Sequence, residues 1–379
     1  FMRGEGACPI AVCADILVCA LLLESDEARL GRVVKPMLRR LDEVCGRHGR
    51  ELRPLRESLS DISAATDLVS LLRMMTHQMV DLSGSVPAGD WLDELLYPWI
   101  QDEWFNDPAG DGMRPALSGG DLFRVGRAAG DEPLAQLGAH LYHQNHLPSQ
   151  TVTGRLMEAA QADLLESTFG KPQRLRYAAL RNNLLMAARV PDLYCSLHVG
   201  GGRGNAGDIA LFASGTPILV DAGREISARS VPILADRDQL AAPPRPCIAD
   251  FEARQDQEIL SVDVTSAYPA ACELRSYQRT VLTLRREQVV RIVDALDFAA
   301  PHSVTFRFVC AVKPVLLNGA VRLGPVRMTW EGDFNAVAVP LSPTLTLLEL
   351  TAPQPIRQSF FTFTVTGGVG GAGGQSLPR

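Results

Sequence analysis

The spacing of apolar residues changes once along this chain, and that change limits the folds it can adopt. Up to about residue 180, apolar side chains recur every three or four residues, as on one side of an amphipathic helix. From about residue 183 they alternate with their neighbours, which is the period of a strand. The sequence predicts a helical domain over residues 1–182, a β domain over residues 183–366 and a flexible glycine-rich tail over residues 367–379.

Three apolar stripes in the first half predict amphipathic helices that pack on one another. The stripes are Leu68-Leu71-Leu72-Met75-Met79, Leu134-Leu137-Leu141 and Leu156-Ala160-Leu164. Asp131 and Pro133 predict the start of the second of these helices, as an N-cap and a first-turn proline. The stretch from Trp104 to Gly112 mixes aromatic residues with turn formers, so it is predicted to be a long ordered loop, where function often lies.

Strand signals fill the second half. Val304, Phe306, Phe308 and Cys310 recur at every second position. Asn318-Gly319 between two apolar runs is typical of a type I′ hairpin turn. Phe361, Phe363 and Val365 predict a late strand. The second half is therefore predicted to be an antiparallel sandwich of many strands.

Charge and cysteine content exclude several classes of function. The formal net charge of −6 argues against a nucleic-acid partner, which would need a broad positive field. The eight cysteines include no CxxC pair, so the sequence predicts no zinc site, no redox motif and no cofactor. The longest apolar run, from Ile10 to Leu23, is interrupted by Asp15 and is shorter than the roughly 20 residues that a membrane helix needs. No membrane partner is expected.

The same observations predict the localisation of the protein. A chain of this size needs no disulfide framework, and the cysteines in apolar contexts resemble free thiols, which favours a cytoplasmic protein. A periplasmic or secreted protein is the alternative. The first residue is Phe1, so the chain is expected to be a fragment that begins inside a longer protein.

A cluster of polar aromatic residues lies near residue 143. It contains His140, Tyr142, His143, Asn145 and His146. On a continuous helix the three histidines would spread over an arc of about 120°, which is narrow enough for a metal or acid–base site. The helix is predicted to end near Asn145, however, and a solvated helix end carrying histidines is the alternative.

The segment from Gly207 to Gly223, which reads GDIALFASGTPILVDAG, resembles the central signature of the heparinase II/III-like polysaccharide lyases. Residues 267–269, 274–281 and 290–294 are similar to later segments of that family, and residues 4–6 and 104–126 to its helical part. The resemblance implies an α+β multidomain protein, in which an incomplete (α/α) toroid precedes a large antiparallel β-sandwich. It also implies β-elimination on uronate-containing polysaccharides, with no cofactor.

The chain departs from the family at the positions that carry the chemistry. Family members have a histidine-rich loop before the signature strand, whereas this chain has Gly200-Gly201-Gly202-Arg203-Gly204-Asn205-Ala206 there. The tyrosine expected after Glu5-Gly6 is absent. A histidine-asparagine pair further on is replaced by Asp238-Gln239. These losses beside a persistent scaffold indicate a degenerate or repurposed site.

The remaining side chains suggest one way in which a lyase site can still form. Arg203 stays charged at any workable pH, so it can neutralise a uronate carboxylate but is a poor base. His198 is the best remaining base, although a histidine on a strand is more often packed or solvent-facing. Tyr142 is the candidate acid.

Two further residues are candidates for binding the sugar. Asn205 can hydrogen-bond a carboxylate or simply form a turn, and Trp104 can stack on a sugar ring. The expected partner is a uronate-containing poly- or oligosaccharide. A glycan-binding homologue without activity and an inactive fragment remain alternative readings, and the oligomeric state stays open.

Overall fold

The structure is a computed structural model, and it divides the chain into two compact units, residues 1–174 and 175–379. It describes residues 10–23, 27–45, 54–75, 77, 92–93, 95–102, 104–107, 115–168, 172, 177–179, 185–190, 192–200, 205–221, 228–241 and 247–367. The first unit is called the helical unit below, and the second the β unit. The sequence boundary expected at residues 182 and 183 falls between two strands of the β unit that pair with each other. The glycine-rich tail lies outside the described residues, apart from Gly367.

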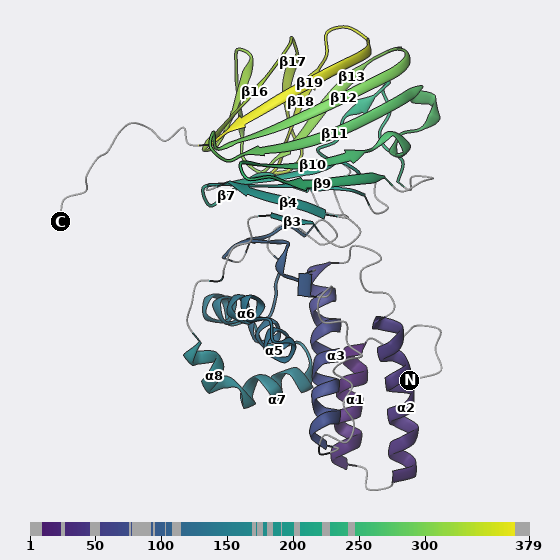
Figure 1. Ribbon diagram of the computed structural model, residues 1–379, viewed down its shortest axis with the longest axis vertical. Helices are drawn as coiled ribbons and strands as arrows, with labels where there is room; N and C mark the ends of the chain where they lie inside the picture. The colour runs from purple at the N-terminus through teal and green to yellow at the C-terminus, as the bar shows by residue number, and fades with distance from the viewer. Residues whose placement is uncertain are drawn as a thin grey trace, which may run out of the picture. The chain divides into compact units, whose positions relative to one another are not determined.

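Helices make up most of the helical unit (Figure 1). The elements are α1 (Ile10–Leu23), α2 (Glu27–Cys45), α3 (Leu55–Met75), β1 (Trp99–Gln101), β2 (Trp104–Phe105), α5 (Gly119–Ala129), α6 (Glu132–Asn145), α7 (Val152–Ala160) and α8 (Ala162–Ser167). Helix α1 packs against α2 and α3, and α5 packs against α6 and α3. Of the stripe predicted on α3, Leu68 and Leu72 are buried and Leu71 is half-buried; the side chain of Met75 and the whole of Met79 lie outside the described residues.

Helix α6 forms as its sequence predicts. Asp131 is the N-cap, and its carboxylate accepts a hydrogen bond of 2.9 Å from the Leu134 amide. Pro133 occupies the first turn, where its missing N–H costs nothing. Leu134, Leu137 and Leu141 are all buried, so the apolar stripe of this helix faces the core of the helical unit.

The capping contact gives a testable stability difference. We expect Asp131→Ala to lower the free energy of unfolding by about 1 kcal/mol, because the Leu134 amide loses its acceptor. Urea denaturation followed by circular dichroism measures the change. Asp131→Ser keeps a capping oxygen and should retain most of the stability; an equal loss in both variants would contradict the capping role.

Two predictions for the helical unit are wrong. Leu156 and Leu164 are 56% and 45% exposed, because the helix expected to carry them breaks at Gln161 into α7 and α8. Gln161 has φ −113° and ψ 10°, which turns the two leucines away from a common stripe. Trp104 begins strand β2, which pairs with β1, so a loop starting at Trp104 does not form; residues 108–112 of that stretch lie outside the described residues.

The first apolar run forms helix α1, and its interrupting aspartate has a structural partner. Asp15 accepts hydrogen bonds from the Thr153 amide at 2.9 Å and from the Thr153 hydroxyl at 2.8 Å. It therefore satisfies the free N–H groups at the start of α7. Within the described residues no helix is long and apolar enough to cross a membrane.

The β unit contains two antiparallel sheets (Figure 1). Its strands are β3 (Tyr177–Ala179), β4 (Leu185–Val190), β5 (Leu193–His198), β6 (Ile209–Ala213), β7 (Thr216–Leu219), β8 (Ile233–Leu234), β9 (Ile248–Ala253), β10 (Gln257–Asp263), β11 (Leu274–Leu284), β12 (Val289–His302), β13 (Val304–Cys310), β14 (Pro314–Leu317), β15 (Ala320–Leu323), β16 (Val326–Trp330), β17 (Asn335–Pro340), β18 (Thr346–Thr351) and β19 (Ile356–Thr366). Short 3₁₀ turns, η3 (Thr265–Ala267) and η4 (Ala270–Cys272), lie between β10 and β11.

The strand order defines the two sheets. Among the described residues, one sheet has eight strands in the order β14-β15-β16-β19-β12-β11-β10-β9. The other has nine, in the order β17-β18-β13-β7-β6-β5-β4-β3, with β8 paired to β13. The predicted antiparallel sandwich is therefore confirmed.

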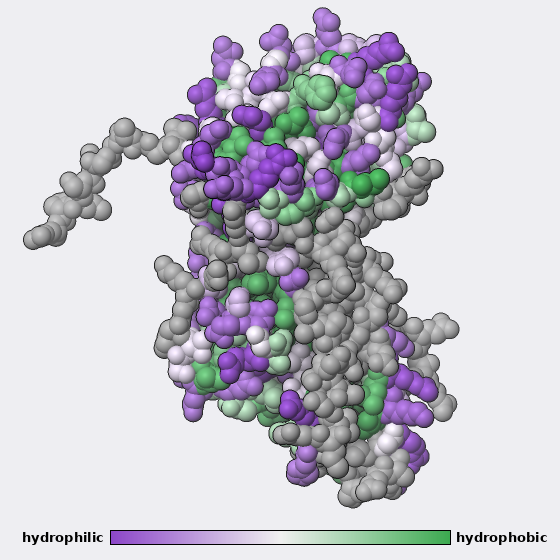
Figure 2. All heavy atoms as spheres, in the orientation of Figure 1, coloured by the Kyte–Doolittle hydropathy of each residue, from purple (hydrophilic) through white to green (hydrophobic). Residues whose placement is uncertain are grey.

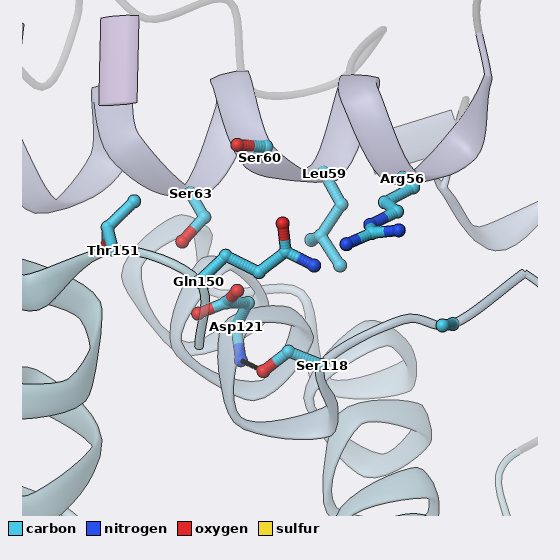
Figure 3. Close-up of a pocket in the computed structure, with 9 residues that line it drawn as sticks. Arg56, Leu59, Ser60, Ser63, Ser118, Asp121, Gln150 and Thr151 are labelled. Carbon is cyan, nitrogen blue, oxygen red and sulfur yellow. Dashed lines mark hydrogen bonds between the residues drawn. The ribbon is translucent and has the colours of Figure 1, made fainter. Parts of the chain in front are cut away.

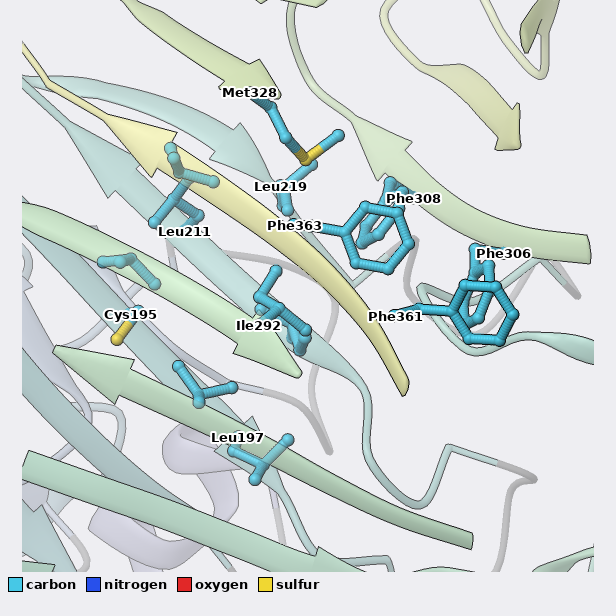
Figure 4. Packing of buried hydrophobic residues seen from close by; sticks show 14 of the residues in the cluster. Cys195, Leu197, Leu211, Leu219, Ile292, Phe306, Phe308, Met328, Phe361 and Phe363 are labelled. Atoms are coloured by element: carbon cyan, nitrogen blue, oxygen red, sulfur yellow. The ribbon is translucent and has the colours of Figure 1, made fainter. Parts of the chain in front are cut away.

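One apolar core joins the two sheets (Figure 4). Phe306 of β13 lies with its ring centre 4.9 Å from that of Phe361 and 5.0 Å from that of Phe363, both on β19. Phe308 lies 5.3 Å from Phe363. These contacts cross from one sheet to the other, and they use the residues whose alternation predicted the strands. On the face drawn in Figure 2, hydrophilic residues cover much of the β unit, with hydrophobic ones scattered between them.

The hairpin between β14 and β15 is confirmed, but its turn type is not. Leu317 pairs with Ala320, which leaves Asn318-Gly319 as a two-residue turn. Gly319 has φ 65°, whereas Asn318 is not among the residues with positive φ. A type I′ turn needs positive φ at both positions, so this turn is of another type.

Candidate functional site

His198 is the last residue of β5, and Asn205 lies in the turn that precedes β6. The His198 backbone N–H donates to the Asp208 carbonyl at 2.9 Å, and the His198 carbonyl accepts from the Gly207 amide at 2.7 Å. The Asp208 amide closes a tight turn by donating to the Asn205 carbonyl at 3.0 Å. His198 is 6% and Asn205 3% exposed. The structure thus brings these two candidates together; Arg203 lies outside the described residues.

An arginine from the opposite sheet holds this turn. Arg279 of β11 donates one N–H to the Gly207 carbonyl at 2.9 Å and one to the Ser230 carbonyl at 2.7 Å. Its other two nitrogens bind both carboxylate oxygens of Asp294, at 2.7 and 3.0 Å. The Tyr277 hydroxyl also donates to Asp294, at 2.8 Å. Because Arg279 and Asp294 are fully buried, this ion pair fixes the turn to the core.

Sequence reasoning placed Tyr277, Arg279 and Asp294 in family-like segments but gave them no role. A signal was present: in β11 the inward positions are Tyr277, Arg279 and Val281. Asp294 occupies an inward position of β12 directly opposite Arg279 in the strand register. Opposite charges at paired inward positions of two neighbouring strands indicate a buried ion pair between the strands.

Gln239 holds the same turn from another direction. Its side-chain N–H₂ donates to the Ala206 carbonyl at 2.7 Å and lies 3.4 Å from the Tyr268 hydroxyl. That hydroxyl donates to the Pro232 carbonyl at 2.7 Å. The preceding residue, Asp238, forms an ion pair with Arg307. The pair Asp238-Gln239, which the sequence resemblance set against a histidine-asparagine pair, is thus engaged in structural contacts.

Asp208 is a buried carboxyl group beside the turn. Its Oδ1 accepts from the Ile209 amide at 2.8 Å and from the Ser230 amide at 3.1 Å, whereas Oδ2 has no hydrogen-bond partner within the described residues. Burial raises the pKa of Asp208 to about 7, and the Asp221 carboxylate acts in the same direction, while Arg229 and the backbone amides act against it. The Asp208 carboxyl therefore titrates near neutral pH.

Comparison with solved structures places the whole chain in a known architecture. A heparan sulfate lyase from Pedobacter heparinus superposes with a TM-score of 0.64 at 12% identity, covering 100% of this chain and 62% of that one. A chondroitin AC lyase from Streptomyces coelicolor gives 0.58 at 13%, covering 97% and 62%. A xanthan lyase from Paenibacillus gives 0.62 at 10%, covering 96% and 44%. The chain has a polysaccharide-lyase fold.

This fold confirms the predicted order of helices followed by an antiparallel sandwich, and the described helices of the helical unit show only part of the toroid. The chain spans about three fifths of the length of the heparan sulfate lyase. No protein-family model and no curated protein matches its sequence. At such low identity the shared polysaccharide-lyase fold assigns no role to any residue.

The other residues that the sequence proposed for a site lie in the helical unit. Tyr142 is half-buried on α6, with its ring centre 5.8 Å from that of His143 and 5.4 Å from that of His146. The helix ends at Asn145 as predicted, and His146 is its C-cap with φ 48°. His140 instead faces Asp102, at 3.6 Å. No group of side chains suited to a metal occurs in the described part of the chain.

Trp104 is half-buried in strand β2 of the same unit, so its indole projects from a strand and not from the predicted loop. It neighbours Phe105, which is buried, and Trp99 of the paired strand β1 is buried as well. The structure therefore places Trp104 and Tyr142 in the helical unit, and His198 and Asn205 in the β unit.

A polar pocket in the helical unit was missed by sequence reasoning (Figure 3). It lies between α3, the start of α5 and the segment before α7, and is lined by Arg56, Leu59, Ser60, Ser63, Ala116, Ser118, Asp121, Gln150 and Thr151. Buried Arg124 binds Asp121 at 2.6 Å, Asp67 at 3.1 Å and Ser63 at 3.1 Å. Burial raises the pKa of Asp67 and opposes the effect of Arg124. Arg124 thus links two lining residues, Ser63 of α3 and Asp121 of α5, through buried hydrogen bonds.

Proposed function

We propose that the chain is a lyase that cleaves uronate-containing poly- or oligosaccharides by β-elimination. The observation that carries the proposal is the fold, since three solved structures that match at least 96% of this chain are named as lyases of heparan sulfate, chondroitin and xanthan. The turn that holds His198 and Asn205 supports it, because hydrogen bonds fix both ends of the loop that also contains Arg203 in the sequence.

The reaction needs three groups, and the chain has a candidate for each. Arg203 neutralises the uronate carboxylate, so that the proton on C5 becomes acidic. His198 removes that proton, the C4–O bond breaks, and the electron pair forms the C4=C5 double bond. The departing glycosidic oxygen takes up a proton, and Tyr142 of the helical unit is the candidate donor that the sequence offers. The products are a new reducing end on one fragment and an unsaturated uronate at the non-reducing end of the other.

The unsaturated uronate absorbs in the ultraviolet, which provides the test. Purified protein is incubated with heparan sulfate, chondroitin sulfate, xanthan and alginate, and the absorbance of the conjugated product is followed. We expect a steady rise with at least one polymer, and a fall of about 100-fold or more in rate for His198→Gln and Arg203→Ala. His302→Gln is the matched control, because His302 pairs with Glu273 at 3.0 Å, outside the candidate site. A flat trace with folded protein would exclude the lyase.

A second candidate function is binding of the same glycans without cleavage. The burial of His198 and Asn205, at 6% and 3% exposure, favours it, because a base must reach the proton that it removes. Isothermal titration with oligosaccharides of the same polymers distinguishes the two functions. Binding without any rise in absorbance would establish a glycan-binding protein, and a rise that requires His198 would exclude that reading.

A further inference from the structure

Gln239 is the side chain through which a separate segment of the β unit reaches the turn at residues 205–208. Its amide nitrogen lies 2.7 Å from the Ala206 carbonyl. The next carbonyl along, that of Gly207, accepts from Arg279 on the opposite sheet. Two consecutive peptide groups of the turn are thus held from two directions, and this limits how Asn205 can move.

The backbone around Gln239 is itself fixed. Asp238, on one side, is paired with Arg307, whose Nε also donates to the Val231 carbonyl at 3.2 Å. Leu240, on the other side, donates its amide to the Ala267 carbonyl at 2.7 Å. Because both neighbouring residues are held by hydrogen bonds, the backbone of Gln239 is fixed. Its side chain therefore loses little conformational freedom when it binds the Ala206 carbonyl.

Arg279 and Gln239 both hold the turn, but their loss would have different effects on the rest of the β unit. Arg279 is fully buried and neutralises Asp294, so its loss disturbs the core of the sandwich. Gln239 is half-buried and uncharged, and its side-chain nitrogen contacts one carbonyl and one hydroxyl. Substitution of Gln239 therefore perturbs the turn while leaving the core intact.

We propose that Gln239 is a positioning residue, which holds the turn at residues 205–208 and through it the side chains of Asn205 and His198. The inference rests on the proposed function for its effect on catalysis. The effect of Gln239 on the turn rests on its hydrogen bond to the Ala206 carbonyl and is independent of that function. Because a misplacement of about 1 Å costs up to about 100-fold in rate, the effect falls on turnover more than on substrate binding.

The test uses Gln239→Met, which keeps the length of the side chain and removes the N–H donor. Gln278→Met is the matched control, since Gln278 donates to the Ser261 hydroxyl at 2.8 Å elsewhere in the β unit. Hydrogen exchange by mass spectrometry reports on the Gly207 and Asp208 amides, which close the turn. We expect their exchange to be at least ~10-fold faster in Gln239→Met and unchanged in Gln278→Met.

Kinetics of the absorbance assay provide the second readout. We expect kcat to fall about 10-fold in Gln239→Met with KM nearly unchanged, a split that a general loss of stability does not produce. Unchanged exchange overturns the inference even if the wild type cleaves polysaccharide, and so does faster exchange with an unchanged kcat. An inert wild type whose turn still loosens in Gln239→Met contradicts the proposed function and supports Gln239 as the anchor of the turn.

Discussion

The Asp294→Asn variant is expected to lose about 3–5 kcal/mol of unfolding free energy, the largest effect of any single substitution considered for this chain. The Asp294 carboxylate binds two nitrogens of Arg279 and accepts from Tyr277, and neither charged residue is exposed. Removing its charge leaves the Arg279 guanidinium buried without a counterion. Desolvation of that uncompensated charge is the main cost.

Urea denaturation of the wild type and the variant measures this loss. The matched control is Glu252→Gln, because Glu252 and Arg254 form an exposed ion pair at 2.7 Å in the same unit. Solvent screens that pair, so the control should change stability little. Equal behaviour of the two variants would show that the buried pair does not hold the sandwich together.

A double-mutant cycle separates the charge pairing from the other contacts of Arg279. In Arg279→Met with Asp294→Asn, no charge remains buried at the pair, so the combined loss should be smaller than the sum of the single losses. The Gly207 and Ser230 carbonyls still lose their donors. The double variant should therefore stay below the wild type in stability, and strictly additive losses would contradict a direct coupling.

The architecture could be predicted from the sequence because local periodicity records which face is buried. The alternation of Phe306 and Phe308 marked one inner face of the sandwich, and Asp131 marked the start of α6. The stripe through Leu156 and Leu164 failed for a local reason. One residue, Gln161, leaves the helical conformation, and periodicity across a break carries no information about burial.

The candidate site was only partly predictable. The end of β5 at His198 and the turn at Asn205 followed from sequence pattern, since both are local features. The groups that hold them lie far away in the chain: Arg279 is 72 residues from Gly207, and Gln239 is 33 residues from Ala206. The Arg279 contact forms only when the two sheets stack, and the Gln239 contact only when a distant segment folds onto the turn, so no spacing rule for a single strand or turn reveals them.

The stability of the chain should also depend on the protonation of Asp208. Its pKa is raised from an ordinary value of 3.8 to about 7 in the folded chain, first by burial and then by the Asp221 carboxylate. The folded state thus binds this proton more tightly than the unfolded state does. The stabilising contribution is full below about pH 4 and is lost as the pH rises to about 7.

The Asp208→Asn variant removes this titration. Asparagine keeps an oxygen that can accept from the Ile209 and Ser230 amides, and it carries no charge. We expect Asp208→Asn to be more stable than the wild type at pH 8, by roughly 2–4 kcal/mol, and to approach it in stability near pH 4.

Urea midpoints measured at several pH values between 4 and 8 provide the comparison. The matched control is Asp192→Asn, because Asp192 is an exposed aspartate of the same unit. Its profile should run parallel to that of the wild type, since an exposed carboxylate is hydrated in both states. If the pH profile of Asp208→Asn also ran parallel to that of the wild type, the Asp208 carboxyl would be equally solvated in the folded and unfolded chains. That result would contradict the raised pKa. Convergence of the Asp208→Asn and wild-type profiles towards low pH would instead identify a buried proton next to the turn that carries His198 and Asn205.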